Sequence, residues 1–238
     1  MSCKIVVFPH AGGNANSYLQ WKRFLKYPVY PIEYSGHWTR FDEPQYFCFE
    51  ELLADIVAII TKVVSAKDTL YLVGHSMGGL VAFAVDYKIQ MQKFCRVGAL
   101  FISSCVPMEN DVWKTFKAVT DEDVKMFLYR IHHNSEKVLN SSFFHENLLP
   151  SIKNDFRIIT EMRNCDILKK NCSDAPIICL SGKKDPIIPD TKALKEWEAF
   201  TSKSVKYFEF EGDHFYLNNL KNREKICLII NETIMFGT

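Results

Sequence analysis

The sequence lacks the features that mark nucleic-acid-binding, membrane-spanning and secreted proteins. Its formal net charge is only +1 over 238 residues, which gives no electrostatic case for binding nucleic acid or an anionic membrane. The longest apolar stretches, such as Asp55 to Val64, are interrupted and fall far short of the roughly 20 residues that a membrane-spanning helix needs. The first residues, MSCKIVVF, enter a strand-like run without a charged leader or a cleavage site. We therefore expect a cytoplasmic protein that is neither secreted nor bound to a membrane.

The eight cysteines form no C-x-x-C pair, and the chain has no internal repeat, low-complexity tract or linker. Cys105, Cys179 and Cys227 fall inside apolar runs, where a thiol packs as a small hydrophobic side chain, and free thiols fit a reducing compartment. The adjacent His132 and His133 have no third ligand at metal spacing, so we interpret them as a solvated helix end. The sequence therefore predicts no metal and no cofactor.

Apolar, β-rich runs alternate with helical patterns along most of the chain. Strand-like runs cover residues 4–8, 29–34, 69–73, 97–104, 176–180 and 205–210, and helical patterns cover residues 16–25, 49–64, 80–91, 191–200 and 223–236. This alternation is typical of a parallel sheet covered by helices. Pro31 indicates an irregular or edge position for the second run. The length and the 47% hydrophobic content suit one α/β domain over residues 1–238.

The alternation stops between residues 109 and 172. No convincing strand occurs there, and helical patterns cover residues 121–131, 136–139 and 146–162. We expect this helical insertion to form a lid over the edge where the strands end; the alternative is that it only covers core. It carries ten basic and ten acidic residues, so charge indicates no docking face on it.

Residues 68–84, DTLYLVGHSMGGLVAFA, contain the clearest catalytic pattern. A strand-like run, the turn Gly74-His75-Ser76-Met77-Gly78 and a helical run are typical of a nucleophile elbow, which lifts a serine above the end of a strand. Side chains two positions on either side of the serine would collide with the neighbouring strand and helix, so these positions require glycine. Ser76 is therefore the candidate nucleophile.

A serine hydroxyl needs a base within hydrogen-bond reach, and that base needs an orienting partner. Asp185 and His214 follow the last two strand-like runs, at the sheet edge where the elbow is expected. The chain order Ser76, Asp185, His214 is that of α/β hydrolases and is more specific than the elbow alone. Asp174, before a strand, Asp190, near a helix start, and Asp213, next to His214, are the rival acids. The rival base His75 lies inside the elbow.

The tetrahedral intermediate of acyl transfer carries an oxyanion, which needs preorganised donors. One expected donor is the amide of Met77, directly after the nucleophile. The second is expected from the loop after an early strand, where residues 10–13 read His-Ala-Gly-Gly. The two glycines suit close backbone approach, although they also suit a simple tight turn.

Four segments together resemble type II thioesterases, the stand-alone editing enzymes of nonribosomal peptide and polyketide synthases. They are FPHAGG at 8–13, GHSMGG at 74–79, GKKD at 182–185 and GDHF at 212–215, and the likeness extends over nearly the whole chain, including LPSIKNDFR at 149–157 and Trp197. Three departures concern the surroundings of the site. Asp213 precedes His214 where the family usually has glycine, Ser35-Gly36-His37 replaces Pro-Gly-Arg with Arg40 displaced, and Lys153-Asn154 replaces Arg-Ala.

The resemblance implies an α/β-hydrolase fold with Ser76, Asp185 and His214 as catalytic triad, and with the Met77 and Ala11 amides as oxyanion donors. It implies a lid that shapes an acyl and phosphopantetheine channel, and an aberrant or stalled acyl group on a carrier protein as substrate. We expect a monomer. The alternatives are a thioesterase for medium-length fatty acyl chains, a general carboxylesterase, and a non-catalytic module that binds acyl-carrier protein, although such a module has no need of a complete triad.

Overall fold

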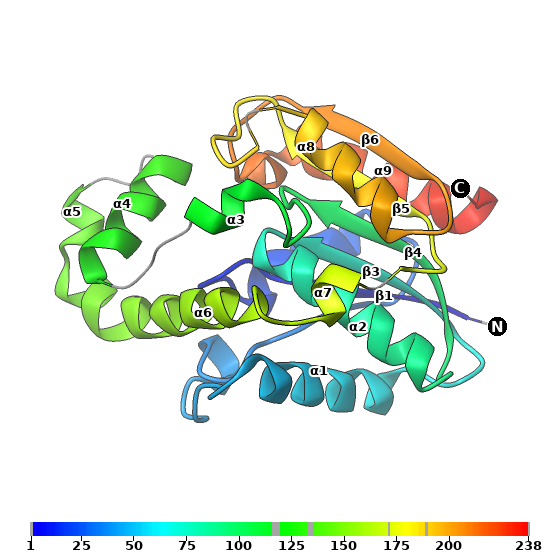
Figure 1. The fold of residues 1–238 in the computed structure, drawn as a ribbon, viewed down its shortest axis with the longest axis horizontal. Helices are drawn as coiled ribbons and strands as arrows, with labels where there is room; N and C mark the ends of the chain where they lie inside the picture. Colours follow the sequence, from blue (N-terminus) through cyan, green and yellow to red (C-terminus); the bar gives the residue numbers. More distant parts are fainter. Residues whose placement is uncertain (1, 116–119, 133–135, 171, 189, 238) are drawn as a thin grey trace.

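The computed structural model describes residues 2–115, 120–132, 136–170, 172–188 and 190–237, and a parallel sheet forms its centre (Figure 1). The six strands lie in the order β2-β1-β3-β4-β5-β6 and every neighbouring pair is parallel, as the alternating pattern predicts. The strands are β1 (Cys3–Phe8), β2 (Val29–Pro31), β3 (Thr69–His75), β4 (Arg96–Ser103), β5 (Ile177–Gly182) and β6 (Val205–Phe210).

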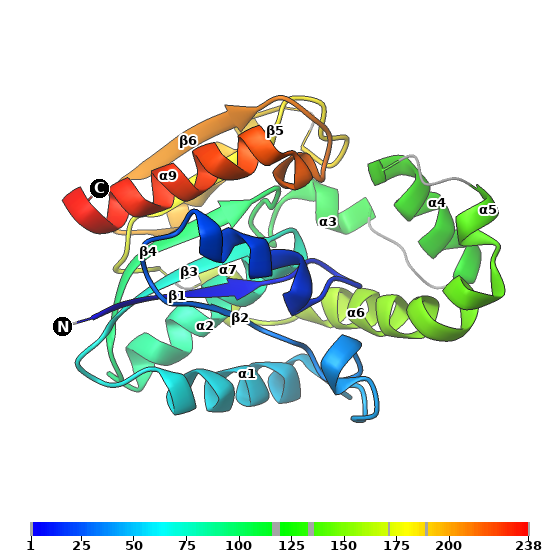
Figure 2. The same ribbon diagram turned by 180° about the vertical axis from the view of Figure 1, so that it is seen from behind.

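Helices cover both faces of the sheet (Figures 1 and 2). One face carries α1 (Phe49–Val63), α2 (Met77–Met91), α7 (Ile167–Lys170), α8 (Lys192–Lys195) and the 3₁₀ helix η4 (Glu196–Phe200); the other carries η1 (Ala15–Arg23), η5 (Tyr216–Asn218) and α9 (Leu220–Phe236). Successive strand side chains point to opposite faces, so Val6 and Phe8 pack on the first layer and Ile5 and Val7 on the second. Both faces are therefore core, which explains the nearly continuous apolar strands.

Several predicted elements differ in type or extent. Residues 15–23 form a 3₁₀ helix rather than an α-helix, and its first turn is capped by Asn14, whose side chain accepts the Ser17 amide at 3.1 Å. Strand β2 ends at Pro31 on the edge of the sheet, three residues earlier than predicted, although the Ile32 amide still donates to the Val7 carbonyl at 2.8 Å. The alternation of an edge strand turns the Pro31 nitrogen away from β1, so the missing amide hydrogen costs no bond to β1. The predicted helix 191–200 divides into α8 and η4, and α9 begins at Leu220 rather than at residue 223.

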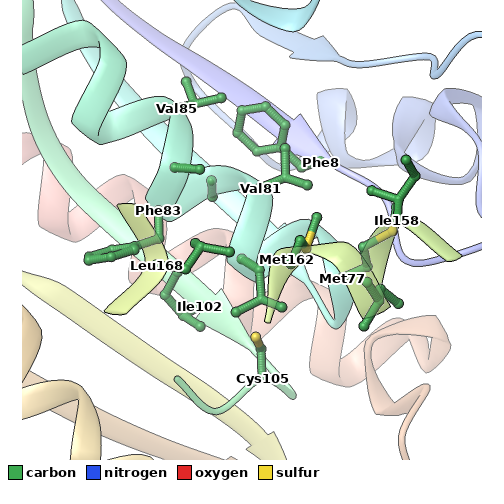
Figure 3. Close-up of a cluster of buried hydrophobic side chains, with 14 of the residues drawn as sticks. Phe8, Met77, Val81, Phe83, Val85, Ile102, Cys105, Ile158, Met162 and Leu168 are labelled. Atoms are coloured by element: carbon green, nitrogen blue, oxygen red, sulfur yellow. The ribbon is translucent and has the colours of Figure 1, made fainter. Parts of the chain in front are cut away.

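Helices are the regular secondary structure found in the described residues of the insertion between β4 and β5. It comprises α3 (Asp111–Thr115), α4 (Asp121–His132), α5 (Glu136–Leu139), the π-helical turn η3 (Phe144–Leu148), α6 (Leu149–Met162) and α7. In Figure 1, α4 and α5 lie beyond the end of the sheet, whereas α6 runs back toward α2. Figure 3 shows Ile158 and Met162 of α6 and Leu168 among the buried side chains around Met77 and Val81 of α2. One part of the insertion thus covers core, and the other projects past the sheet.

All eight cysteines are free thiols. None of the helices in the described part of the chain combines the length and the apolar composition that crossing a bilayer requires.

Candidate active site

Ser76 occupies a strained turn between β3 and α2. Its φ of 54° is positive, a backbone conformation that residues other than glycine rarely adopt. A Cβ atom on Gly74 would lie 2.0 Å from the Gly78 carbonyl oxygen, and one on Gly78 would lie 2.1 Å from the Phe8 carbonyl oxygen. The Ser76 amide donates to the Ser103 carbonyl at 2.8 Å, which ties the turn to β4. Any side chain at Gly74 or Gly78 would therefore clash with the neighbouring backbone, as the sequence pattern indicates.

His214 and Asp185 form a buried pair at the ends of β6 and β5. The His214 Nδ1 atom lies 2.9 Å from Asp185 Oδ2 and 3.0 Å from Oδ1, and the two residues are 1% and 3% exposed, respectively. The Ile187 amide also donates to Asp185 Oδ1 at 2.9 Å. Burial raises the pKa of Asp185, but the hydrogen bond from His214 and the charge of that ring outweigh it, so the net pKa lies below its usual value. An ionised Asp185 holds the Nδ1–H of His214 and leaves Nε2 for proton transfer.

Gly182 allows the two loops of this pair to touch. A Cβ atom at this position would lie 2.3 Å from the Asp213 carbonyl oxygen, and the Lys184 amide donates to the Gly212 carbonyl at 2.9 Å. The loop after β5 therefore packs backbone against backbone on the loop after β6, which fixes the acid relative to the base.

Ser76, His214 and Ala11 line the same cavity, which has a volume of about 280 Å³. Its remaining wall is mostly apolar and comes from the insertion and the Asp185 loop: Val112, Trp113, Met126, Phe127, Leu128, Arg130, Ile131, Phe156, Ile159, Pro186 and Ile187, with His10 and Phe215 beside the base. No hydrogen bond joins Ser76 Oγ to His214 among the described residues. Hydrogen bonds between nucleophile and base are often long in the absence of substrate, so this geometry is compatible with a contact that forms on binding.

The two amides predicted as oxyanion donors lie at the start of α2 and in the turn after β1. Met77 is the first residue of α2, where an amide has no partner within the helix. Ala11 lies in the turn that the Gly13 amide closes on the His10 carbonyl at 2.8 Å. Within the described residues neither the Met77 nor the Ala11 amide has a hydrogen-bond acceptor, so both are available to a ligand.

His75 and the rival acids have other contacts. His75 is buried, with Nδ1 2.9 Å from Ser103 Oγ, which in turn lies 2.7 Å from the Tyr216 hydroxyl. Burial, and after it the neighbouring His214 and His10, lower the pKa of His75 well below its usual value, so its ring is neutral. Asp190 and Asp213 accept the backbone amides of Lys192 and Phe215, each at 2.8 Å, and Asp174 is exposed. His133 lies outside the described residues, as does the side chain of His132.

A second buried histidine–carboxylate contact lies next to Ala11, and the spacing of residues in the sequence does not reveal it. Asp155 of α6 accepts the Gly12 amide at 2.7 Å and faces His37 Nε2 at 3.0 Å. His37 and Asp155 are 118 residues apart, and neither follows a central strand. Only the motif resemblance drew attention to both segments, without indicating that they meet.

Comparisons with known proteins show where this arrangement belongs. Thioesterase TesA of Mycobacterium leprae is 29% identical over 233 residues, 97% of this chain and 86% of that protein. The medium-chain S-acyl fatty acid synthase thioesterase of Homo sapiens is 23% identical over 94% of this chain and 84% of its own length. The crystal structure of ClbQ from the colibactin NRPS/PKS pathway is similar to this chain with a TM-score of 0.85 at 24% identity, over 99% of this chain and 98% of that one. This likeness in fold confirms the predicted α/β-hydrolase class. The family model of the thioesterase domain matches residues 3–234. The chain therefore belongs to the thioesterase domain family, as its motifs indicate, and is a hydrolase that acts on thioesters.

Proposed function

We propose that this thioesterase removes aberrant or stalled acyl groups from the phosphopantetheine arm of carrier proteins in nonribosomal peptide and polyketide synthesis. The observation that carries the proposal is the buried Asp185–His214 pair, whose histidine lines one mostly apolar cavity together with the serine of the elbow. The pathway named for ClbQ supports the carrier-bound substrate. The partner is then an acyl- or peptidyl-carrier protein. We take the protein to act as a monomer, and a cytoplasmic location accords with the free thiols of the chain.

The proposed mechanism begins with attack of Ser76 Oγ on the thioester carbonyl carbon while His214 Nε2 takes the hydroxyl proton. Asp185 holds Nδ1–H, so the ring keeps the tautomer that accepts at Nε2. The amides of Met77 and Ala11 donate to the oxyanion. Collapse of the intermediate releases the carrier's thiol, protonated by His214, and leaves an acyl-serine. Water then attacks the acyl-serine with His214 again as base, which releases the carboxylic acid and restores Ser76.

We further propose that the helical insertion acts as a lid and forms most of the acyl site. Apolar side chains of α3, α4 and α6 line the cavity, so an acyl chain would be removed from water as it binds. Arg130 of α4 donates to the Pro186 carbonyl at 2.9 Å, which links the projecting part of the insertion to the loop that carries Asp185. Movement of α4 would therefore open the cavity directly beside the base.

A second candidate function is hydrolysis of medium-length fatty acyl thioesters. The apolar wall of the cavity and the match to the human medium-chain enzyme favour it. A general carboxylesterase would use the same site without a carrier protein. A non-catalytic carrier-binding module is disfavoured, because it would not need an acid–base pair buried at a strained serine.

A panel of acyl donors separates these functions. The purified protein is assayed for hydrolysis of acetyl-, octanoyl- and aminoacyl-carrier protein and of simple esters. We expect highest kcat/KM on short acyl or aminoacyl groups attached to a carrier. A higher kcat/KM on octanoyl-carrier protein would favour the fatty acyl function. A higher kcat/KM on simple esters would favour the esterase.

The nucleophile is tested separately with Ser76→Ala and with a fluorophosphonate probe. We expect Ser76→Ala to lose nearly all turnover and all labelling. The control is Ser204→Ala, an exposed serine at the amino end of β6, which should behave as wild type. Wild-type turnover in Ser76→Ala would overturn the mechanism, and an unreactive Ser76 in the wild-type protein would favour the binding module.

A further inference from the structure

A carboxylate oxygen of helix α6 accepts a hydrogen bond from the loop after β1. Asp155 has no exposed surface, and its Oδ2 atom receives both the Gly12 amide, at 2.7 Å, and His37 Nε2, at 3.0 Å. The other oxygen, Oδ1, is buried and has no hydrogen-bond partner among the described residues. A buried carboxylate with so few donors depends strongly on each of them, because charge removed from water is costly unless it is paired.

The surroundings of His37 determine which form of its ring fits. Nε2 faces the Asp155 carboxylate and Nδ1 lies 3.1 Å from the Ser35 carbonyl oxygen, so both ring nitrogens face acceptors. Only the imidazolium form carries a hydrogen on both nitrogens; a neutral ring would turn a lone pair toward one of the two oxygens. Burial disfavours the charge, but the charge of Asp155 and the hydrogen bonds to Asp155 and Ser35 outweigh it, so the net pKa of His37 is raised.

The other ionisable groups near His37 include Glu33, Tyr34 and Arg40, and Arg40 in turn has a partner on α1. Glu33 accepts the Ala15 amide at 3.2 Å and the Thr39 hydroxyl at 3.3 Å, and as a carboxyl group it changes charge on the acidic side. The Tyr34 ring lies edge-on to His37 with centroids 5.7 Å apart, and burial raises the pKa of its hydroxyl well above the usual value. Arg40 is paired with Glu43 and with Asp55. In this cluster His37 is therefore the group whose charge changes as the solution becomes alkaline.

The loop that Asp155 holds is the one that carries the proposed second oxyanion donor. Gly12 directly follows Ala11 and has φ +72°, and a Cβ atom on it would lie 2.4 Å from Cγ1 of Ile152 on α6. The backbone of this loop therefore presses against α6, and the Asp155–Gly12 hydrogen bond fixes its orientation. Rotation of the peptide between Ala11 and Gly12 would break that bond.

We propose that His37 is a positioning residue: as a cation held between Asp155 and Ser35, it keeps Asp155 on the Gly12 amide and so keeps the Ala11 amide directed at the oxyanion. The inference rests on the proposed function of Ala11. Loss of the His37 proton loosens the loop, so turnover falls as the pH rises, and the loss appears in kcat rather than in KM, because the donor matters most in the transition state.

The pH dependence of kcat and KM tests the proposal in wild type, His37→Gln and His145→Gln. Glutamine can still donate to Asp155 but does not titrate. We expect wild type to lose kcat on the alkaline side, and His37→Gln to show a kcat lower by roughly tenfold near neutrality, less than loss of a whole oxyanion donor, with no alkaline decline. His145 lies in η3 of the same insertion and is not among the hydrogen-bond partners of Asp155, so His145→Gln should reproduce the wild-type profile. An unchanged alkaline decline in His37→Gln would overturn the proposal.

An NMR titration of the histidine rings supplies a readout independent of turnover. In the folded wild-type protein we expect the His37 ring to carry both protons at neutral pH and to titrate above the usual histidine pKa. Asp155→Asn should lower the His37 pKa, because it keeps the shape and removes the charge. A neutral His37 ring at pH 7 would contradict the inference. If the proposed nucleophile is wrong, Ser76 labelling fails instead, so the two failures are distinguishable.

Discussion

Two buried histidine–carboxylate pairs lie in the described part of the molecule, and they differ in what the second ring nitrogen faces. In the Asp185–His214 pair the carboxylate holds Nδ1, and Nε2 has no acceptor among the described residues. In the Asp155–His37 pair the carboxylate faces Nε2, and a backbone carbonyl faces Nδ1. A ring with one free nitrogen can accept a proton, whereas a ring between two acceptors is held as a cation. The same two residue types thus suit two different chemical tasks.

The two pairs are also built on different supports. Asp185 and His214 follow adjacent parallel strands, and Gly182 lets their loops touch. His37 lies in a loop after the edge strand β2, and Asp155 lies on the insertion. The first pair is therefore fixed within the sheet framework, whereas the second connects the insertion to that framework. We expect changes in the first pair to affect chemistry directly and changes in the second to act through the loop that it holds.

The largest contrast is expected from replacing the two histidines. His214→Gln removes the proposed base, so kcat on the preferred acyl thioester should fall by about 10⁶-fold, the loss seen when a serine hydrolase loses its histidine. His37→Gln should cost only about tenfold, since the chemical groups are still present. Steady-state assays of both variants, with circular dichroism to confirm folding, make the comparison. Equal losses in the two variants would show that the two pairs do not divide the work in this way.

Replacing the carboxylate of the first pair should have a smaller effect than replacing its histidine. Asp185→Asn leaves the shape of the pair but no longer fixes the tautomer of His214, and kcat should fall by about 10⁴-fold. Asp190→Asn is the matched control and should be unaffected, because Asp190 follows the same strand but is exposed and hydrogen-bonded to the Lys192 amide. If Asp185→Asn lost less than about tenfold, another group would have to orient His214.

Much of the framework of the first pair is predictable from the sequence for one physical reason. Parallel strands place their carboxyl ends at one edge, so Asp185 and His214, each a few residues after a strand, come together there without any information about side-chain packing. The elbow is predictable because its glycines answer to backbone clashes that any serine in such a turn would cause. The catalytic roles of these residues stay predictions for the experiments above.

The second pair could not be predicted, because no local pattern connects its members. His37 lies in an irregular loop and Asp155 on a helix whose path depends on the packing of the whole insertion. Helix type was also beyond the local pattern: over nine residues, the spacing of Tyr18 and Trp21 fits a 3₁₀ helix as well as an α-helix. Side-chain contacts between distant segments decide both features.

The loop after β1 donates to Asp155 through Gly12 and lines the cavity with His214 through Ala11. Gly12→Ala tests the role of this loop. The added Cβ must displace Ile152 and requires a positive φ, so the Ala11 amide should move and kcat should fall by about 10²–10³-fold, as for loss of one oxyanion donor. Gly237→Ala is the matched control, because Gly237 also has a positive φ, +79°, but nothing lies within 4 Å of the added atom. An unchanged kcat in Gly12→Ala would show that this loop does not supply the donor.

The smallest expected effect is on stability, and there the two pairs should respond to pH in opposite directions. The pKa of His37 is raised by folding, so its contribution is fully present below the usual histidine pKa and is lost as the pH rises through the folded value. The pKa of Asp185 is lowered, so its contribution is present above the usual aspartate pKa and is lost as the pH falls.

Urea unfolding of wild type and His37→Gln at pH 6 and pH 9 measures the first of these contributions. At pH 6 wild type should exceed His37→Gln by about 1 kcal/mol in the free energy of unfolding, the value of a buried hydrogen bond, and at pH 9 the difference should shrink. Differences in side-chain volume and packing do not depend on pH, so only the change between the two conditions reports the ionised pair. A difference that is the same at both pH values would mean that His37 does not carry a proton whose loss the folded protein resists, and the contrast between a base and a fixed cation would have to be abandoned.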